Sequence, residues 1–150
     1  MLRTRWPVAV FVLWSVYVWV TRIVNALGDD TANKPLAVVL ALTVLAPALA
    51  TGVVLVRARE RLLVDAEARL WRAFAGWSAL VWLVRGAEIA VSDHELAFKV
   101  VHVAIGAVSV GLAAATVAVT RHEVAAARTS SPGRGRTPTV GGSSAVAAGR

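Results

Sequence analysis

Four long apolar blocks, separated by short charged connections, set the main constraint on this chain. They cover about residues 7–27, 35–56, 73–91 and 98–119. A helix needs about 20 residues to cross the roughly 30 Å of hydrocarbon in a bilayer, and each block meets or approaches that length. The sequence therefore predicts an all-α membrane protein with four transmembrane helices. A soluble four-helix bundle is the alternative, but its helices would need polar outer faces, which the second and fourth blocks lack.

The charges between the blocks predict the orientation of the helices. Arginines gather before the first block, between the second and third, and after the fourth, whereas the connections GDDTANK and SDHEL are largely acidic. Because positively charged connections stay in the cytoplasm, we expect a multi-pass protein of the bacterial inner membrane with both termini cytoplasmic. Anionic lipid headgroups are the expected partner for the net charge of +7. No basic patch interleaved with aromatic residues points to nucleic acid.

This pattern divides the chain into two hairpins, a connecting segment and a tail. The hairpins cover residues 1–56 and 73–120, with the segment 57–72 between them and the tail 121–150 after them. Leucine and alanine recur at helical spacing in RARERLLVDAEARLWR, which predicts an amphipathic helix in the cytoplasmic interface. The tail is basic and rich in glycine, serine and proline, so we expect it to be disordered.

A nine-residue pattern occurs at the same place in each hairpin. WSVYVWVTR ends at Arg22 and WSALVWLVR ends at Arg85, so both fit WSxxxWxxR. The other fixed residues of this pattern are Trp14, Ser15, Trp19, Trp77, Ser78 and Trp82, and Val18 also matches Val81. We interpret the chain as two copies of one hairpin, which run parallel because each copy has an even number of spans. A signal peptide cannot recur in mid-chain, so the first block is not interpreted as one.

The hairpin also resembles short actinobacterial integral membrane proteins of unknown function. The resemblance lies in WSxxxWxxR, the acidic turn and the valine-rich return helix. In those proteins one hairpin, often with a histidine in its second helix, makes up the whole chain. The resemblance implies a fused double version over residues 8–120, with His102 in the matching position of the second copy and Val39 in the first. It implies neither a reaction nor a ligand.

Polar residues inside the apolar blocks form the candidate site: Arg22, Asn25, Arg85, Glu88 and His102. An arginine at the centre of a membrane helix costs about 2.5–3.5 kcal/mol on the insertion scale. Arg85 must therefore pair, lie shallow or face the bundle interior, and Glu88 is close enough on the same helix to pair with it. We favour an ion pair that fixes the register of the bundle. The alternative is an outward-facing pocket for an anion, a lipid headgroup or a proton path.

Small side chains on the second and fourth blocks predict the faces that pack against the arginine-bearing helices. Small residues let two helices approach closely. The fourth block has Lys99, His102, Gly106, Ser109 and Ala113 on one face, and the second block has Thr43, Ala46, Pro47 and Ala50.

The sequence contains no motif that is typical of an enzyme or of a cofactor-binding protein. The chain has no cysteine, no metal-ligand spacing and no nucleotide-binding motif, and only His102 is placed to bind haem. We therefore expect no enzymatic activity, no cofactor and no metal. The expected function is that of a structural or accessory component of a membrane complex, with other membrane proteins or a second copy as partners. The alternative is a small transporter or channel with a pocket at Arg22, Arg85, Glu88 and His102.

Overall fold

The described part of the chain folds into four helices. A computed structural model describes residues 5–28, 34–93 and 95–129. The helices are α1 (Trp6–Gly28), α2 (Lys34–Arg57), α3 (Asp65–Val91) and α4 (Leu96–Thr129). All four are long and apolar enough to cross a membrane, which confirms the predicted all-α class and the four candidate spans.

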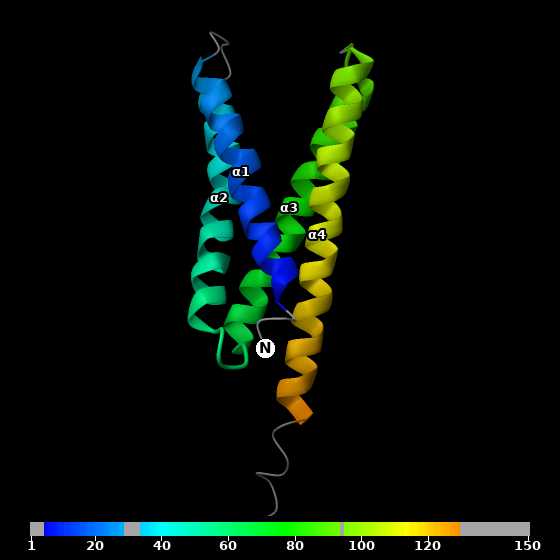
Figure 1. Ribbon diagram of the computed structural model, residues 1–150. Helices are drawn as coiled ribbons and strands as arrows, with labels where there is room; N and C mark the ends of the chain where they lie inside the picture. The colour runs from blue at the N-terminus through cyan, green and yellow to red at the C-terminus, as the bar shows by residue number, and fades with distance from the viewer. Residues whose placement is uncertain (1–4, 29–33, 94, 130–150) are drawn as a thin grey trace, which may run out of the picture.

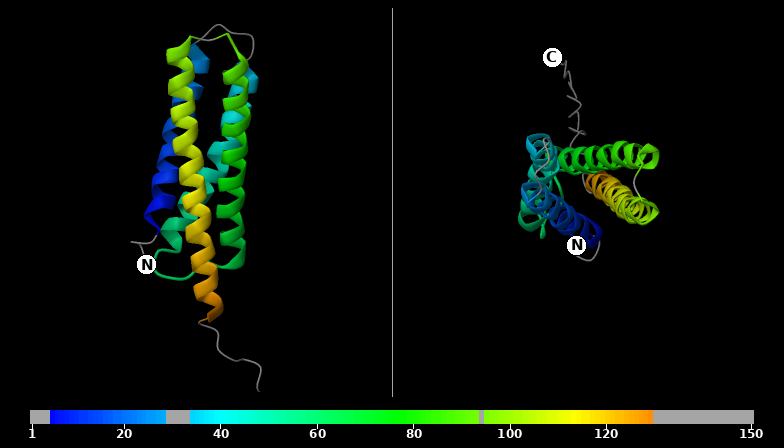
Figure 2. Two further views of the ribbon diagram at one scale, coloured as in Figure 1. Left: turned by 90° about the vertical axis from the view of Figure 1, so that its right-hand side faces the viewer. Right: turned by 90° about the horizontal axis from the view of Figure 1, so that it is seen from above.

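The two hairpins meet at one end of the molecule and separate toward the other (Figure 1). Helix α1 packs against α2 and α4, while α3 packs against α4 and α2. We call the end that holds Trp6, Arg57 and Asp65 the closed end, and the end that holds Gly28 and Val91 the open end. Helix α4 continues past the closed end, beyond the other three helices (Figure 2).

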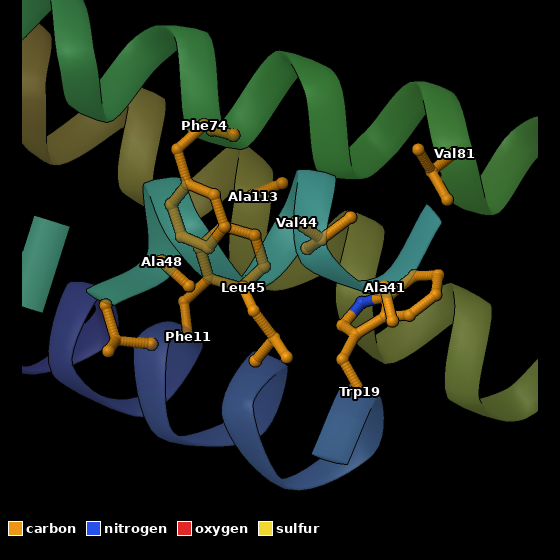
Figure 3. Close-up of a cluster of buried hydrophobic side chains, with 11 residues drawn as sticks. Phe11, Trp19, Ala41, Val44, Leu45, Ala48, Phe74, Val81 and Ala113 are labelled. Carbon is orange, nitrogen blue, oxygen red and sulfur yellow. The ribbon is translucent and has the colours of Figure 1, made fainter. Parts of the chain in front are cut away.

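Aromatic rings fill the axis between the hairpins (Figure 3). Phe11 of α1 stacks on Phe74 of α3 with ring centroids 4.6 Å apart. Toward the open end, Trp19 and Trp82 meet with centroids 6.1 Å apart. Both pairs join residues 63 positions apart in the sequence, the spacing of the WSxxxWxxR pattern. Only 28% of the most apolar window of each helix is buried, so most of the apolar surface faces outward, as lipid contact requires.

Two predicted boundaries are wrong at the closed end. Residues 121–129, expected to belong to a disordered tail, continue helix α4, and its Glu123 is buried. Residues 65–72, expected to belong to a separate interfacial helix, are the first two turns of α3, and Trp71 is fully buried among the closed-end residues. In both segments a buried side chain anchors the helix to the bundle. Residues 130–150 lie outside the described part of the chain.

The predicted packing face of α2 is not its buried face, although Thr43 accepts a hydrogen bond from Trp77 of α3, and that of α4 holds in part. Thr43, Ala46 and Ala50 are exposed. The buried face of α2 consists of Ala41, Val44, Leu45, Ala48 and Thr51. Small residues occur all around this helix, so their presence did not distinguish one face from another. On α4, Ser109 and Ala113 are buried as predicted.

Candidate functional site

Three of the predicted polar residues lie at the same depth in the open end, on three different helices. Arg22 and Arg85 each precede the last residue of their helix by six positions, and His102 follows the first residue of α4 by six. At 1.5 Å per residue this places them about 9 Å from the helix ends. The shared depth follows from the position of each residue within its own apolar block.

Four of the five predicted residues line one cleft between α1, α3 and α4, which we call the polar cleft. Its volume is about 280 Å³, and its lining consists of Arg22, Arg85, Glu88, Ile89, Ser92, Phe98 and His102. Asn25 is exposed and lies in a neighbouring cleft of about 220 Å³ that Arg22 and His102 also line. The structure thus brings the predicted residues to one region, while their role stays a prediction.

The Arg85–Glu88 ion pair lies within α3. Arg85 Nη1 donates to Glu88 Oε2 at 2.7 Å, and the two side chains are 36% and 54% exposed. Because both residues belong to one helix, this bond cannot by itself fix the register of α3 against its neighbours. The Nε of Arg85 is buried and has no hydrogen-bond partner, although buried donors are normally satisfied.

Arg22 and His102 differ in how their side chains are held. The Arg22 guanidinium lies 5.9 Å from the centroid of the Trp19 ring, within cation–π range. No carboxylate in the described part of the chain pairs with it. His102 Nδ1 lies 2.9 Å from the carbonyl oxygen of Phe98. A carbonyl oxygen only accepts hydrogen bonds, so Nδ1 carries a proton.

A second, apolar cleft separates α2 from α3 near the open end. It has a volume of about 450 Å³ and is lined by Leu36, Ala37, Leu40, Trp77, Leu80, Val81, Val84, Arg85 and Glu88. Its last two lining residues also line the polar cleft. The Arg85–Glu88 pair therefore forms the boundary between a polar and an apolar compartment.

The closed end holds a buried polar network that sequence reasoning missed. Arg5 is 1% exposed, and its Nε donates to Glu123 Oε1 at 2.8 Å. Its Nη1 and Nη2 donate to the carbonyl oxygens of Ala58 and Arg61 at 2.6 and 2.9 Å, and its guanidinium lies 5.9 Å from the Trp71 ring centroid. One side chain thus joins the start of α1, the connection 58–64 and α4.

One sequence signal could have drawn attention to this network. Glu123 is the only acidic residue after residue 95, and it lies four residues after the end of the fourth apolar block. Sequence reasoning used Arg5 only as a flanking positive charge and did not single out Glu123. A lone carboxylate beside an apolar block needs a cation when it is buried, and the first arginines of the chain are at the same end.

A second ion pair orders the start of α3. Arg61 Nη2 donates to Glu67 Oε1 at 2.6 Å, and Glu67 Oε2 accepts the backbone N–H of Val64 at 3.0 Å. The hydrogen bond to Glu67 raises the pKa of Arg61, an exposed side chain. The Glu67 carboxylate thus satisfies a free backbone donor at the start of the helix, as in a capping box.

The geometry offers little for metal binding. Within residues 5–28, 34–93 and 95–129, no three histidine or carboxylate side chains come close enough together to hold a metal ion. Comparison of the chain with protein-family models, with curated proteins and with solved structures gave no match. The resemblance to short actinobacterial hairpin proteins stays a prediction, and the function is argued from the two ends of the molecule.

Proposed function

We propose that this chain is a non-enzymatic accessory component of a bacterial membrane complex, with both termini in the cytoplasm. The observation that carries the proposal is the extension of α4 beyond the closed end. Residues 121–129 continue as helix, and the Arg5–Glu123 network holds the extension against the bundle. An anchored helix that projects past the other helices offers a defined surface to a cytoplasmic partner.

Charge supports this orientation. The closed end includes Arg57, Arg59 and Arg61, all exposed, and the positive-inside rule assigns such a connection to the cytoplasm. The Phe11–Phe74 and Trp19–Trp82 pairs support the proposed duplication, since copies of one helix related by an axis place equivalent residues opposite each other at that axis.

Cysteine labelling tests the orientation, because the chain has no cysteine of its own. Glu60→Cys places a thiol in the closed-end connection, and Asp93→Cys places one at the open end; both positions are exposed. We expect a membrane-impermeant maleimide to label position 93 in intact spheroplasts and position 60 only after permeabilisation. The reverse labelling pattern would show that both termini lie outside the cytoplasm, and equal labelling of the two positions would indicate dual topology.

Site-specific photo-crosslinking in cells tests the accessory role. A photoreactive residue at His122 samples the exposed face of α4 beside the buried Glu123, where the projecting part begins, whereas one at Ala114 samples the same helix about two turns back; both positions are exposed. We expect one discrete protein adduct from position 122 and none from position 114. The absence of a protein adduct at position 122 would contradict the accessory role.

A transporter is the second candidate, favoured by the polar cleft that Arg22, Arg85, Glu88 and His102 line. Against an open channel, the stacked rings of Phe11 and Phe74 fill the axis nearer the closed end. Flux of small anions and cations into vesicles reconstituted with the protein separates the two candidates. If the protein is an accessory component, the vesicles that contain it should show the same flux as vesicles without protein. If it is a transporter, the flux should exceed that of vesicles without protein, and Glu88→Gln should change it.

A further inference from the structure

The two clefts at the open end together have the form of an amphiphile site. The polar cleft of about 280 Å³ and the apolar cleft of about 450 Å³ share Arg85 and Glu88 in their linings. A molecule that occupies both would place a polar group among the arginines and an apolar chain between α2 and α3. Lipids have this shape, and a protein in a bilayer is surrounded by them.

The charges that line the polar cleft favour a lipid whose headgroup is anionic. Arg22 and Arg85 are positive and Glu88 is negative, so these three side chains leave one positive charge unbalanced. Arg22 has no carboxylate partner in the described part of the chain, and the buried Nε of Arg85 has no acceptor. Both guanidinium groups thus offer donors for an anionic oxygen, and arginine matches phosphate oxygens well.

The depth of the arginines fits a headgroup as well. They lie about 9 Å from the ends of α1 and α3, and long arginine side chains extend toward the interface while their stems stay in apolar surroundings. The apolar cleft is lined by leucine, valine and tryptophan side chains of α2 and α3. These side chains can contact an acyl chain that runs from the headgroup into the hydrocarbon.

We propose that the open end binds a lipid with a singly charged phosphodiester headgroup. The phosphate oxygens accept hydrogen bonds from the guanidinium groups of Arg22 and Arg85, and Glu88 holds Arg85 from the other side through Nη1. One acyl chain lies in the apolar cleft against Leu40 and Leu80. The inference rests on the membrane insertion proposed above and is independent of the accessory role.

Native mass spectrometry of the full chain in neutral detergent tests this site. The protein is mixed with equal amounts of phosphatidylglycerol and phosphatidylcholine that have the same acyl chains. We expect one phosphatidylglycerol to remain bound in preference to phosphatidylcholine by about tenfold, the effect of one or two charge-assisted hydrogen bonds. Equal retention of the two lipids by the wild-type protein would overturn the proposal without any variant.

Matched variants locate the headgroup. Arg22→Gln should remove most of the preference, and Arg22→Lys should retain part of it because the charge remains. Arg57→Gln makes the same charge change at an exposed closed-end position and should leave the preference intact. If Arg57→Gln lowers the preference for phosphatidylglycerol as much as Arg22→Gln does, the protein selects lipids by its overall charge. The proposed headgroup site at Arg22 is then refuted.

A second pair of variants separates a bound lipid from free phosphate. Leu80 lines the apolar cleft, whereas Leu83, three residues later on α3, does not. Leu80→Gln should weaken phosphatidylglycerol retention more than Leu83→Gln. If the two variants behave alike and inorganic phosphate displaces the lipid, the cleft binds the phosphate group alone and the lipid proposal fails. Absence of the protein from the membrane fraction of cells would instead refute the proposed insertion.

Discussion

The closed and open ends each contain an arginine–glutamate pair, but the two pairs differ in burial and in what they connect. Arg5 and Glu123 are 1% and 9% exposed and join α1 to α4. Arg85 and Glu88 are 36% and 54% exposed and lie three residues apart on α3. Removing one partner of a buried pair leaves an uncompensated charge, whereas an exposed pair contributes little. The pair that holds helices together is therefore at the closed end.

This difference assigns separate roles to the two ends. At the closed end, the Arg5 donors also bond backbone oxygens of the 58–64 connection, which ties both hairpins together. At the open end, Arg22 has no carboxylate partner in the described part of the chain and Arg85 Nε has no acceptor. Every guanidinium nitrogen of Arg5 thus has an acceptor, whereas the arginines of the open end keep donors that a ligand can satisfy.

The largest expected effect comes from breaking the closed-end pair. Glu123→Leu leaves the Arg5 guanidinium buried without its counter-charge, which should lower the free energy of unfolding by about 3–5 kcal/mol. Thermal unfolding of the purified protein in detergent measures the loss. The double variant Arg5→Met/Glu123→Leu removes both charges and should recover a large part of it. A loss below about 1 kcal/mol in the single variant would show that the pair behaves as an exposed one.

A steric change between α1 and α2 should have the next largest effect. A Cβ added at Gly52 would lie 3.3 Å from Val12 Cγ1, whereas one at Gly111 of α4 would meet nothing within 4 Å. Gly52→Leu should therefore cost about 1–3 kcal/mol through overpacking. Gly111→Leu is the matched control and should stay close to the wild type in the same unfolding assay. Equal losses would mean that backbone effects, rather than packing against Val12, dominate.

Hydrogen bonds from the two repeated tryptophans should have smaller effects. Trp14 Nε1 donates to Ser109 Oγ at 2.9 Å, and Trp77 Nε1 donates to Thr43 Oγ1 at 3.2 Å. Ser109 is buried and Thr43 is exposed, so Ser109→Ala should cost about 0.5–1.5 kcal/mol and Thr43→Val less. If Thr43→Val lowers the free energy of unfolding more than Ser109→Ala does, burial does not determine which of these two hydrogen bonds contributes more to stability.

The sequence could predict the spans and the open-end cluster because both depend on local features. Hydrophobic length gives each helix, and the distance of Arg22, Arg85 and His102 from the ends of their apolar blocks gives their common depth. Since these three side chains lie at a common depth, they line one cleft as soon as their helices pack next to one another. Whether they bind a ligand depends on unsatisfied donors, which become visible only when all partners of each side chain are known.

The closed-end network could not be predicted in the same way. Arg5 and Glu123 are 118 positions apart, and the Arg5 side chain that pairs with Glu123 is also held by carbonyl oxygens of Ala58 and Arg61. The buried face of α2 was also out of reach, because apolar residues surround that helix and no polar stripe marks its outer face. Long-range pairing and the rotation of a uniformly apolar helix are properties of the assembled bundle.

The smallest expected effect comes from the open-end pair. Glu88→Gln removes a charge whose partner lies on the same helix and is itself partly exposed, so the free energy of unfolding should change by no more than about 1 kcal/mol. Arg85→Met/Glu88→Leu should unfold at nearly the same temperature as the wild type. If Glu88→Gln is strongly destabilised and the double variant recovers, the pair supports the bundle, and the contrast between the two ends disappears. If both variants keep their stability, the two charges serve something other than folding, as a headgroup site at the open end requires.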